Sequence, residues 1–237
     1  MRNTLAIGMK ETRGYFSSPM AYIIGTVFLA LTGYLFVTSI SVPFPEASIR
    51  GWIGPTTFIF VLWSPSLTMR LLAEEQKLGT LELLMTSPVR DYEIVIGKYL
   101  STLVILLATL FPTLFYALLL FWFGDPDIVP LLSGYLGLAL FGGATLAIGV
   151  LASSLTSNQV VAAVMSFGLL LLLFLTNQAA DIATGVPARI LEQLSLSGHF
   201  DDFARGIIDL NNVAYYLSVI VVFLFLAIRN IESRRWR

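Results

Sequence analysis

Long apolar stretches separated by short polar segments dominate this chain. Stretches without Asp, Glu, Lys or Arg cover residues 14–45, 51–69, 99–124, 128–180 and 210–228. A helix needs about 20 mostly apolar residues to cross roughly 30 Å of hydrocarbon. The fourth stretch is too long for one helix, and the polar residues Ser153–Asn158 divide it. The pattern predicts an all-α, polytopic membrane protein with six spans, near 20–42, 51–70, 99–123, 130–152, 159–178 and 211–229.

Composition supports a membrane protein and excludes several other classes. Hydrophobic residues make up 57% of the chain and charged residues 12%, against about 25% charged in soluble domains. Six spans leave little sequence for a soluble domain, so we expect a single membrane domain over residues 1–237. A net charge of −1 offers no electrostatic reason to bind nucleic acid. The chain has no cysteine, which excludes disulfides and thiolate metal sites.

The placement of basic residues predicts the orientation in the membrane. If both termini are cytoplasmic, the cytoplasmic segments hold 11 of the 14 Lys and Arg residues. The outer segments then hold only Arg50, Arg189 and Arg205. Because cytoplasmic loops of membrane proteins are enriched in Lys and Arg, we expect both termini inside.

The first 19 residues mix apolar and charged side chains ahead of the first span. This pattern is typical of an amphipathic helix that lies in the inner membrane interface. Pro19 then turns the chain into the span. A cleaved signal peptide does not fit, because the apolar run is much longer than the usual 7–15 residues and lacks a small-residue cleavage site.

The cytoplasmic tract 70–98, RLLAEEQKLGTLELLMTSPVRDYEIVIGK, carries 9 of the 29 charged side chains. We expect 70–78 to continue the second span as a helix that Gly79 stops, since glycine tolerates a left-handed backbone. Thr80 then caps a new short helix with Glu82 in its first turn.

An apolar face is predicted on this short helix, from Leu81, Leu84 and Met85 at i, i+3 and i+4. Ser87 and Pro88 end it and start the next helix as N-cap and first residue, and Asp91 and Glu93 suit that helix's N-terminal end. The prediction is a stiff amphipathic helix on the cytoplasmic face. The alternative is a surface loop whose leucines rest on lipid headgroups.

Two further tracts lie between spans. Ser and Asn in the hairpin 153–158 are suited to cap the flanking helices, which makes a structural turn the simplest interpretation. In the outer segment 179–212, Phe200, Phe203 and Ile207 share one helical face, which predicts a short helix at the outer interface or packed on the span ends.

Motifs for catalysis, metal binding and nucleotide binding are missing from the sequence. It has neither an HExxH motif nor a G-x-S-x-G elbow. A phosphate-binding loop that ends at Gly97-Lys98 would need glycine at position 92 and Ser or Thr at position 99, but the chain has Tyr92 and Tyr99. The only histidine, His199, does not converge with Asp201 and Asp202 on a helix, so we expect it near a helix N-terminus rather than on a metal. The spans carry no charged residues, which argues against proton-coupled transport.

Several segments together resemble the six-span permease subunits of type-2 ATP-binding-cassette (ABC) exporters, in particular the gliding-motility branch. The resemblance covers nearly the whole chain. The segments that carry it are SSPMAYI at 17–23, EEQKLGTLELLMTSPV at 74–89, EIVIGKYL at 93–100, SSLTSNQVVA at 153–162 and HFDDFARGIIDLNNVAYYLS at 199–218. The segment at 74–89 is the most specific.

The resemblance implies a coupling helix near 79–88 that docks into a separate ATPase, with an N-terminal elbow helix over 1–19. The implied docking residues are Glu74, Glu75, Gly79, Thr80, Leu81, Glu82, Leu84, Met85 and Pro88. It also implies a non-catalytic subunit in a bacterial or archaeal inner membrane. Its partners would be a second permease copy and two ATPase subunits, which bind the ATP and Mg, and an accessory protein on the outer side is compatible with such a system.

Two other functions remain as alternatives. A membrane-embedded lipid-modifying enzyme would need a polar cluster at one depth, for which Asn177, Gln178 and Asp181 are the best candidates, although helix-end caps are the simpler role. A gradient-driven secondary transporter would need ion ligands within the spans. Activity of the purified chain without an ATPase would favour either alternative.

Overall fold

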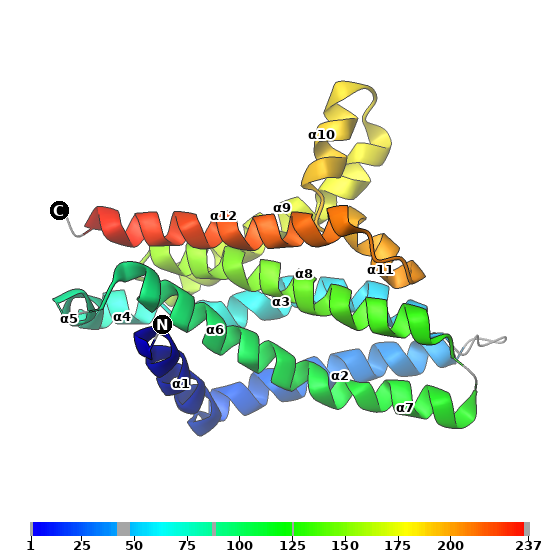
Figure 1. Cartoon of the computed structure of the whole chain (residues 1–237), viewed down its shortest axis with the longest axis horizontal. Helices are drawn as coiled ribbons and strands as arrows, with labels where there is room; N and C mark the ends of the chain where they lie inside the picture. The colour runs from blue at the N-terminus through cyan, green and yellow to red at the C-terminus, as the bar shows by residue number, and fades with distance from the viewer. Residues whose placement is uncertain (1, 42–47, 87–88, 125, 235–237) are drawn as a thin grey trace.

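The computed structural model describes residues 2–41, 48–86, 89–124 and 126–234, and within these ranges the chain is helical without strands. The long helices run side by side along one axis (Figure 1). The elements in chain order are α1 (Arg2–Ser17), α2 (Pro19–Ile40), α3 (Arg50–Thr68), α4 (Ala73–Leu78), α5 (Thr80–Thr86), α6 (Asp91–Leu110), η1 (Phe111–Thr113), α7 (Leu114–Phe123), α8 (Ile128–Leu155), α9 (Gln159–Ile182), α10 (Val186–Leu194), η2 (Gly198–Phe200), α11 (Asp201–Arg205) and α12 (Leu210–Arg234).

Six helical runs are long and apolar enough to cross a membrane, which confirms the all-α polytopic class. They are Pro19–Ile40, Arg50–Leu78, Asp91–Phe123, Ile128–Leu155, Gln159–Ile182 and Leu210–Ser233. The third run begins at Asp91, eight residues before the start expected from the charge-free stretch. It combines α6, η1 and α7, and its 3₁₀ turn contains Pro112, which cannot donate a backbone hydrogen bond.

The centre of the bundle is formed by α3 and α8. The most apolar parts of these two spans are 72% and 78% buried, whereas those of α2, α9 and α12 are each 17% buried. The close contact between α3 and α8 depends on glycines of α8, since a Cβ at Gly134 would overlap Ile53 and one at Gly149 would overlap Thr68. One polar pair crosses the interface, where the hydroxyl oxygens of Ser64 and Thr145 lie 2.7 Å apart.

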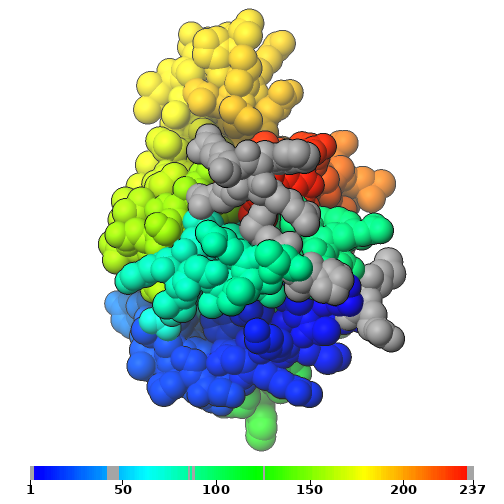
Figure 2. Space-filling model, turned by 90° about the vertical axis from the view of Figure 1, so that its left-hand side faces the viewer, coloured from blue at the N-terminus to red at the C-terminus, as the bar shows by residue number. Residues whose placement is uncertain are grey.

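The two ends of the bundle carry different elements (Figure 1). The start of α1, the end of α12, and α4 with α5 lie at one end, which we call the α5 end. The space-filling view of that end shows α4 and α5 at the surface beside α1 (Figure 2). At the other end α11 lies on the bundle, while the end of α9 and α10 project from its side.

The predicted N-terminal helix is present as α1, which leads directly into the first span. Ser18 has an extended backbone, its Oγ accepts a hydrogen bond from the Met20 N–H, and Pro19 occupies the first turn of α2. This is a standard helix start, because proline has no N–H to leave unpaired there. The short break at Ser18 lets α1 and α2 take different directions.

Candidate coupling site

The segment after α3 turns and then forms the two short helices of the predicted coupling region. Four residues in turns separate α3 from α4, so the expected continuation of the span is interrupted at Met69–Leu72. Gly79 ends α4 with a left-handed backbone, at φ 70°, as its position in the sequence predicts. The new helix α5 begins at Thr80 itself. The Thr80 hydroxyl donates to the Glu75 carbonyl oxygen at 3.4 Å, so Thr80 joins α5 to α4.

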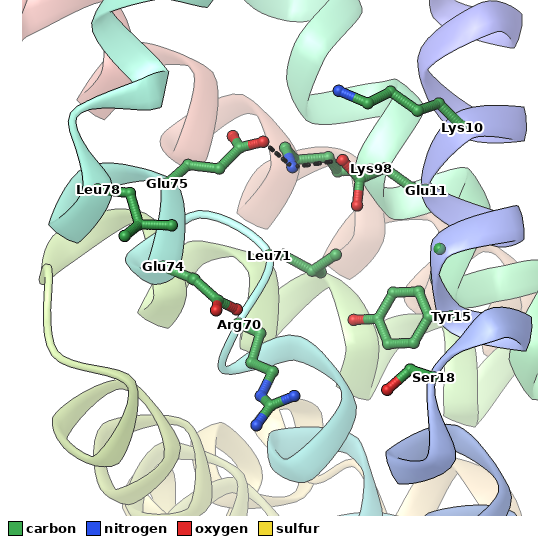
Figure 3. Close-up of a pocket in the computed structure, with 11 residues that line it drawn as sticks. Lys10, Glu11, Tyr15, Ser18, Arg70, Leu71, Glu74, Glu75, Leu78 and Lys98 are labelled. Carbon is green, nitrogen blue, oxygen red and sulfur yellow. Dashed lines mark hydrogen bonds and ion pairs between the residues drawn. The ribbon is translucent and has the colours of Figure 1, made fainter.

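A buried lysine connects this segment to two other helices (Figure 3). Lys98 lies on α6, and its Nζ is 2.8 Å from Glu75 Oε1 on α4 and 2.9 Å from Glu11 Oε1 on α1. The Lys98 side chain is 2% exposed, and the two carboxylate side chains are 18% and 23% exposed. An ammonium group is buried at an acceptable cost only when it is paired, so the three helices are held together by this contact.

Close packing of α1 on α6 brings Glu11 to the lysine. A Cβ at Gly97 would lie 2.9 Å from the Thr4 carbonyl oxygen and 3.0 Å from the Ile7 side chain. Glycine therefore lets the two helices cross one residue before Lys98. The sequence marks Lys98 only as a cytoplasmic cation, because its contact with Glu11 joins residues 87 positions apart.

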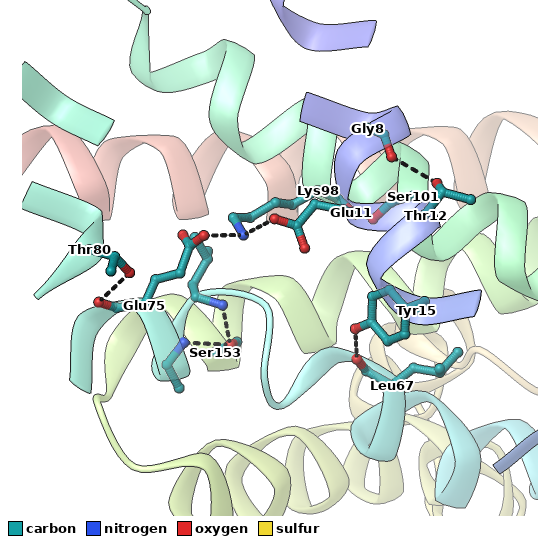
Figure 4. Close-up of polar contacts among 12 residues, drawn as sticks. Gly8, Glu11, Thr12, Tyr15, Leu67, Glu75, Thr80, Lys98, Ser101 and Ser153 are labelled. Carbon is teal, nitrogen blue, oxygen red and sulfur yellow. Dashed lines mark hydrogen bonds and ion pairs between the residues drawn. The ribbon is translucent and has the colours of Figure 1, made fainter. Parts of the chain in front are cut away.

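A serine of α8 caps α4 from a distant part of the chain (Figure 4). Ser153 Oγ accepts hydrogen bonds from the backbone N–H groups of Leu72 and Ala73, both at 3.1 Å, and donates to the Met69 carbonyl oxygen at 3.2 Å. Ser153 is completely buried. Since Leu72 offers no side-chain cap of its own, Ser153 satisfies N–H groups that would otherwise lack partners.

Residues next to Ser153 extend this contact. The backbone oxygen of Ser154 accepts hydrogen bonds from Gln76 Nε2 at 2.9 Å and from Asn230 Nδ2 at 2.7 Å, which connects α4, α8 and α12. The polar segment 153–158 was expected to be a turn. Ser153 and Ser154 instead lie within α8, while Asn158 does cap α9 by accepting from the Val160 N–H at 2.9 Å.

The predicted docking residues fall into inward and outward groups. Leu81 is 4% exposed and packs into the core, and Leu84 is half-buried. Glu82 is exposed beside Leu83, whose side chain is 71% exposed, and Leu78 is 66% exposed. Gly79 and Thr80 are also exposed, and Glu74 is half-buried in a cavity wall. The side chain of Met85 and all of Pro88 lie outside the described residues.

Among the described side chains of α4 and α5, Leu78 and Leu83 are therefore the large apolar ones that face outward, and neither was among the predicted docking residues. The face predicted from Leu81 and Leu84 turns inward. The i, i+3, i+4 rule identifies residues that share a face, but it does not say which face of an amphipathic helix meets the bundle.

The start of α6 corrects a second expectation. We expected Ser87 and Pro88 to begin this helix, and both lie outside the described residues, but α6 begins at Asp91 with Arg90 as its N-cap. The Glu93 carboxylate accepts the Arg90 N–H at 3.1 Å, and it also accepts from Asn3 Nδ2 of α1 at 3.2 Å. The Glu93 side chain thus satisfies the backbone N–H of the N-cap residue, which stabilises a helix start at this position.

At the opposite end, η2 and α11 pack on α8 through the two predicted aromatic residues, one from each element. Phe200 and Phe203 are 2% and 0% exposed, and a Cβ at Gly137 would lie 2.7 Å from Phe203 Cβ. Ile207, predicted on the same face, is 54% exposed because Gly206 ends α11 with φ 94°. The ring of His199 stacks on Tyr215 at 3.8 Å, and its Nδ1 lies 2.8 Å from the Ser195 carbonyl oxygen.

The sequence of this chain matches a known protein family. Residues 44–180, more than half of the chain, match the family described as "ABC-2 family transporter protein". The chain belongs to this family. As an ABC-2 transporter protein with six membrane-spanning helices, it is a permease component of an ABC transporter. The matched segment includes α4, α5, Lys98 and Ser153, whereas α1 and α12 lie outside it. No curated protein matches the chain. Membership of the gliding-motility branch stays a prediction.

Proposed function

We propose that this ABC-2 permease exports its cargo by coupling to a separate ATPase, which docks on the outward face formed by Leu78, Glu82 and Leu83. The observation that supports this most strongly is the pair of short helices α4 and α5 at one end of the bundle, with two large apolar side chains exposed. Exposed leucines beside a carboxylate form a surface that a partner groove would bury.

The contacts behind this face favour the transmission of movement. Glu75 is paired with Lys98 of α6, and Ser153 of α8 caps α4. A displacement of α5 would therefore be passed to two spans and, through Glu11, to α1. In this proposal Glu75 and Leu81 hold the docking element in place, while Glu82 and Leu83 contact the ATPase.

The uneven burial of the spans supports assembly with a second copy. The most apolar parts of α2, α9 and α12 are each only 17% buried. Most of their apolar surface must therefore face lipid or another chain. We propose a permease dimer with two ATPase subunits, which bind ATP and Mg. The α5 end faces the cytoplasm of a bacterial or archaeal cell in this arrangement, in agreement with the basic residues of the positive-inside rule.

Copurification with the ABC ATPase encoded nearest to this chain tests the docking surface. We expect Leu83→Ser and Glu82→Lys each to weaken ATPase binding about tenfold, the scale of one lost buried side chain or charge-assisted contact. Leu5→Ser is the matched control, because Leu5 is a leucine of α1 that is 57% exposed. Full assembly and full ATP-driven transport by both docking variants would disprove the proposed surface.

A further inference from the structure

A cavity of about 340 Å³ lies between α1, α4 and α6 at the α5 end (Figure 3). Its volume is near the lower end of the roughly 300–1,000 Å³ typical of small-molecule sites. Charged side chains of both signs line it, three cationic and three anionic: Lys10, Arg70, Lys98, Glu11, Glu74 and Glu75. The formal charges of the lining therefore cancel, although the charges are separated in space.

Only half of these charges are used within the protein. Lys98 contacts both Glu11 and Glu75. In the part of the chain that the structure describes, Lys10, Arg70 and Glu74 form neither ion pairs nor side-chain hydrogen bonds. Arg70 Nε is moreover buried without a hydrogen-bond partner among these residues. Since an unpaired buried donor is costly, the cavity wall has unused capacity for an anionic group beside an unused carboxylate.

An apolar groove of about 180 Å³ adjoins the cavity at Tyr15, which lines both. The groove lies between α1, α2 and α6, and its walls include Phe16, Leu29 and Ile105. The Tyr15 hydroxyl donates a hydrogen bond to the Leu67 carbonyl oxygen at 2.6 Å, which holds the ring in position. Burial raises the pKa of this hydroxyl, so it stays protonated as a donor. A charged cavity thus meets an apolar groove beside two membrane-spanning helices.

We propose that the cavity and groove together bind a phospholipid whose headgroup carries both a phosphate and a primary ammonium group. Arg70 binds the phosphate, because guanidinium groups are the usual partners of phosphate oxygens and its buried Nε lacks a partner among the described residues. Glu74 accepts hydrogen bonds from the ammonium group. Part of one acyl chain occupies the groove along α2 and α6.

Other headgroups satisfy this site less well. A net anionic headgroup without an amine leaves Glu74 unpaired beside a phosphate. A trimethylammonium group has no N–H with which to donate to a carboxylate. Free phosphoethanolamine has the correct charges but nothing to place in the groove.

Binding of short-chain lipids to the purified full chain in detergent tests the proposal. The probes are dihexanoyl phosphatidylethanolamine, phosphatidylcholine and phosphatidylglycerol, with free phosphoethanolamine as the headgroup alone. We expect phosphatidylethanolamine to bind about tenfold more tightly than each of the other three, as one charged hydrogen-bonded contact predicts. Equal affinity of the three lipids, or a preference for the anionic lipid, would overturn it. Phosphoethanolamine binding as tightly as the lipid would show a soluble ligand instead and would overturn the role of the groove.

Three variants separate the parts of the site. Glu74→Gln should abolish the preference for ethanolamine over choline, whereas Glu192→Gln on the exposed α10 should keep it. Arg70→Gln should weaken all three lipids alike, since it removes the guanidinium group that binds the phosphate. Gly25→Leu should fill the groove and weaken lipids but not phosphoethanolamine, since a Cβ there meets Thr109 Cγ2 at an ordinary 3.6 Å. An ethanolamine preference that survives Glu74→Gln contradicts the assigned site.

Discussion

The two ends of the bundle attach their short helices in different ways. At one end α11 is fixed by aromatic packing, with Phe203 completely buried against Gly137 of α8. At the α5 end polar contacts, the ion pairs of Lys98 and the cap from Ser153, add to the burial of Leu81 in the core. A cavity separates α4 from α1 at this end.

This difference bears on which end can move. Close-packed apolar contacts are lost steeply when surfaces separate, because each contact is short-ranged. Hydrogen bonds and ion pairs can be exchanged for others with similar geometry. The polar attachment therefore suits an element that is displaced during a transport cycle, while the aromatic attachment suits one that keeps its position.

The largest effect is expected at the aromatic end. Phe203→Ala should lower the free energy of unfolding by about 3–5 kcal/mol, because it leaves a cavity between α8 and α11. Thermal and denaturant unfolding in one detergent would measure the loss. Phe123→Ala on α7 is the matched control, since that ring is 83% exposed. If both variants lose the same stability, α11 is not held by aromatic packing.

Removal of the buried cation should have the next largest effect. Lys98→Met leaves the carboxylates of Glu11 and Glu75 beside each other without a counter-charge. This should lower the free energy of unfolding by about 2–3 kcal/mol. The loss is smaller than for a fully buried pair because both carboxylates are partly exposed. Hydrogen exchange should also become faster in α4 and α5. The triple variant with Glu11→Gln and Glu75→Gln should recover much of the stability, since it removes the uncompensated charges. Failure to recover would mean that Lys98 acts through packing alone.

Features that depend on local sequence could be predicted. The six spans follow from the length of the apolar stretches. The end of α4 at Gly79 follows from the ability of glycine to adopt a left-handed backbone. The helix of the third span begins at Asp91, near the start at Ser87 and Pro88 expected from the sequence and eight residues before the charge-free stretch begins. Asp91, Glu93 and Lys98 lie inside α6. Glu93 accepts hydrogen bonds from Asn3 and Arg90, and Lys98 pairs with Glu11.

The internal support of the candidate site could not be predicted. Lys98 and Glu11 are 87 positions apart, and Ser153 is 80 positions from Ala73. Such contacts depend on how the helices pack, which periodicity does not report. The orientation of α5 is a similar case. Leu81 and Leu83 have the same side chain, but the direction in which Gly79 turns the chain decides which of them is buried.

The cap on α4 should contribute less than the ion pairs. Ser153→Ala leaves the N–H groups of Leu72 and Ala73 without their acceptor, which should cost about 1–2 kcal/mol. Amide exchange should rise at the start of α4 and stay unchanged in α11. Ser218→Ala is the control, because that exposed hydroxyl donates only within its own helix. Equal effects of the two substitutions would rule out a capping role for Ser153.

The smallest effect concerns the connection between α4 and α5. Gly79→Ala places a Cβ on a left-handed residue and should destabilise the protein by about 1 kcal/mol, seen as faster exchange in α5. Gly14→Ala makes the same chemical change inside α1, where a Cβ meets nothing within 4 Å. That variant should be neutral or more stable by up to about 1 kcal/mol, because alanine is the better helix former. The two substitutions should therefore differ in sign. The same sign for both would show that the backbone at Gly79 does not need glycine, and that the α5 end is less constrained than its contacts indicate.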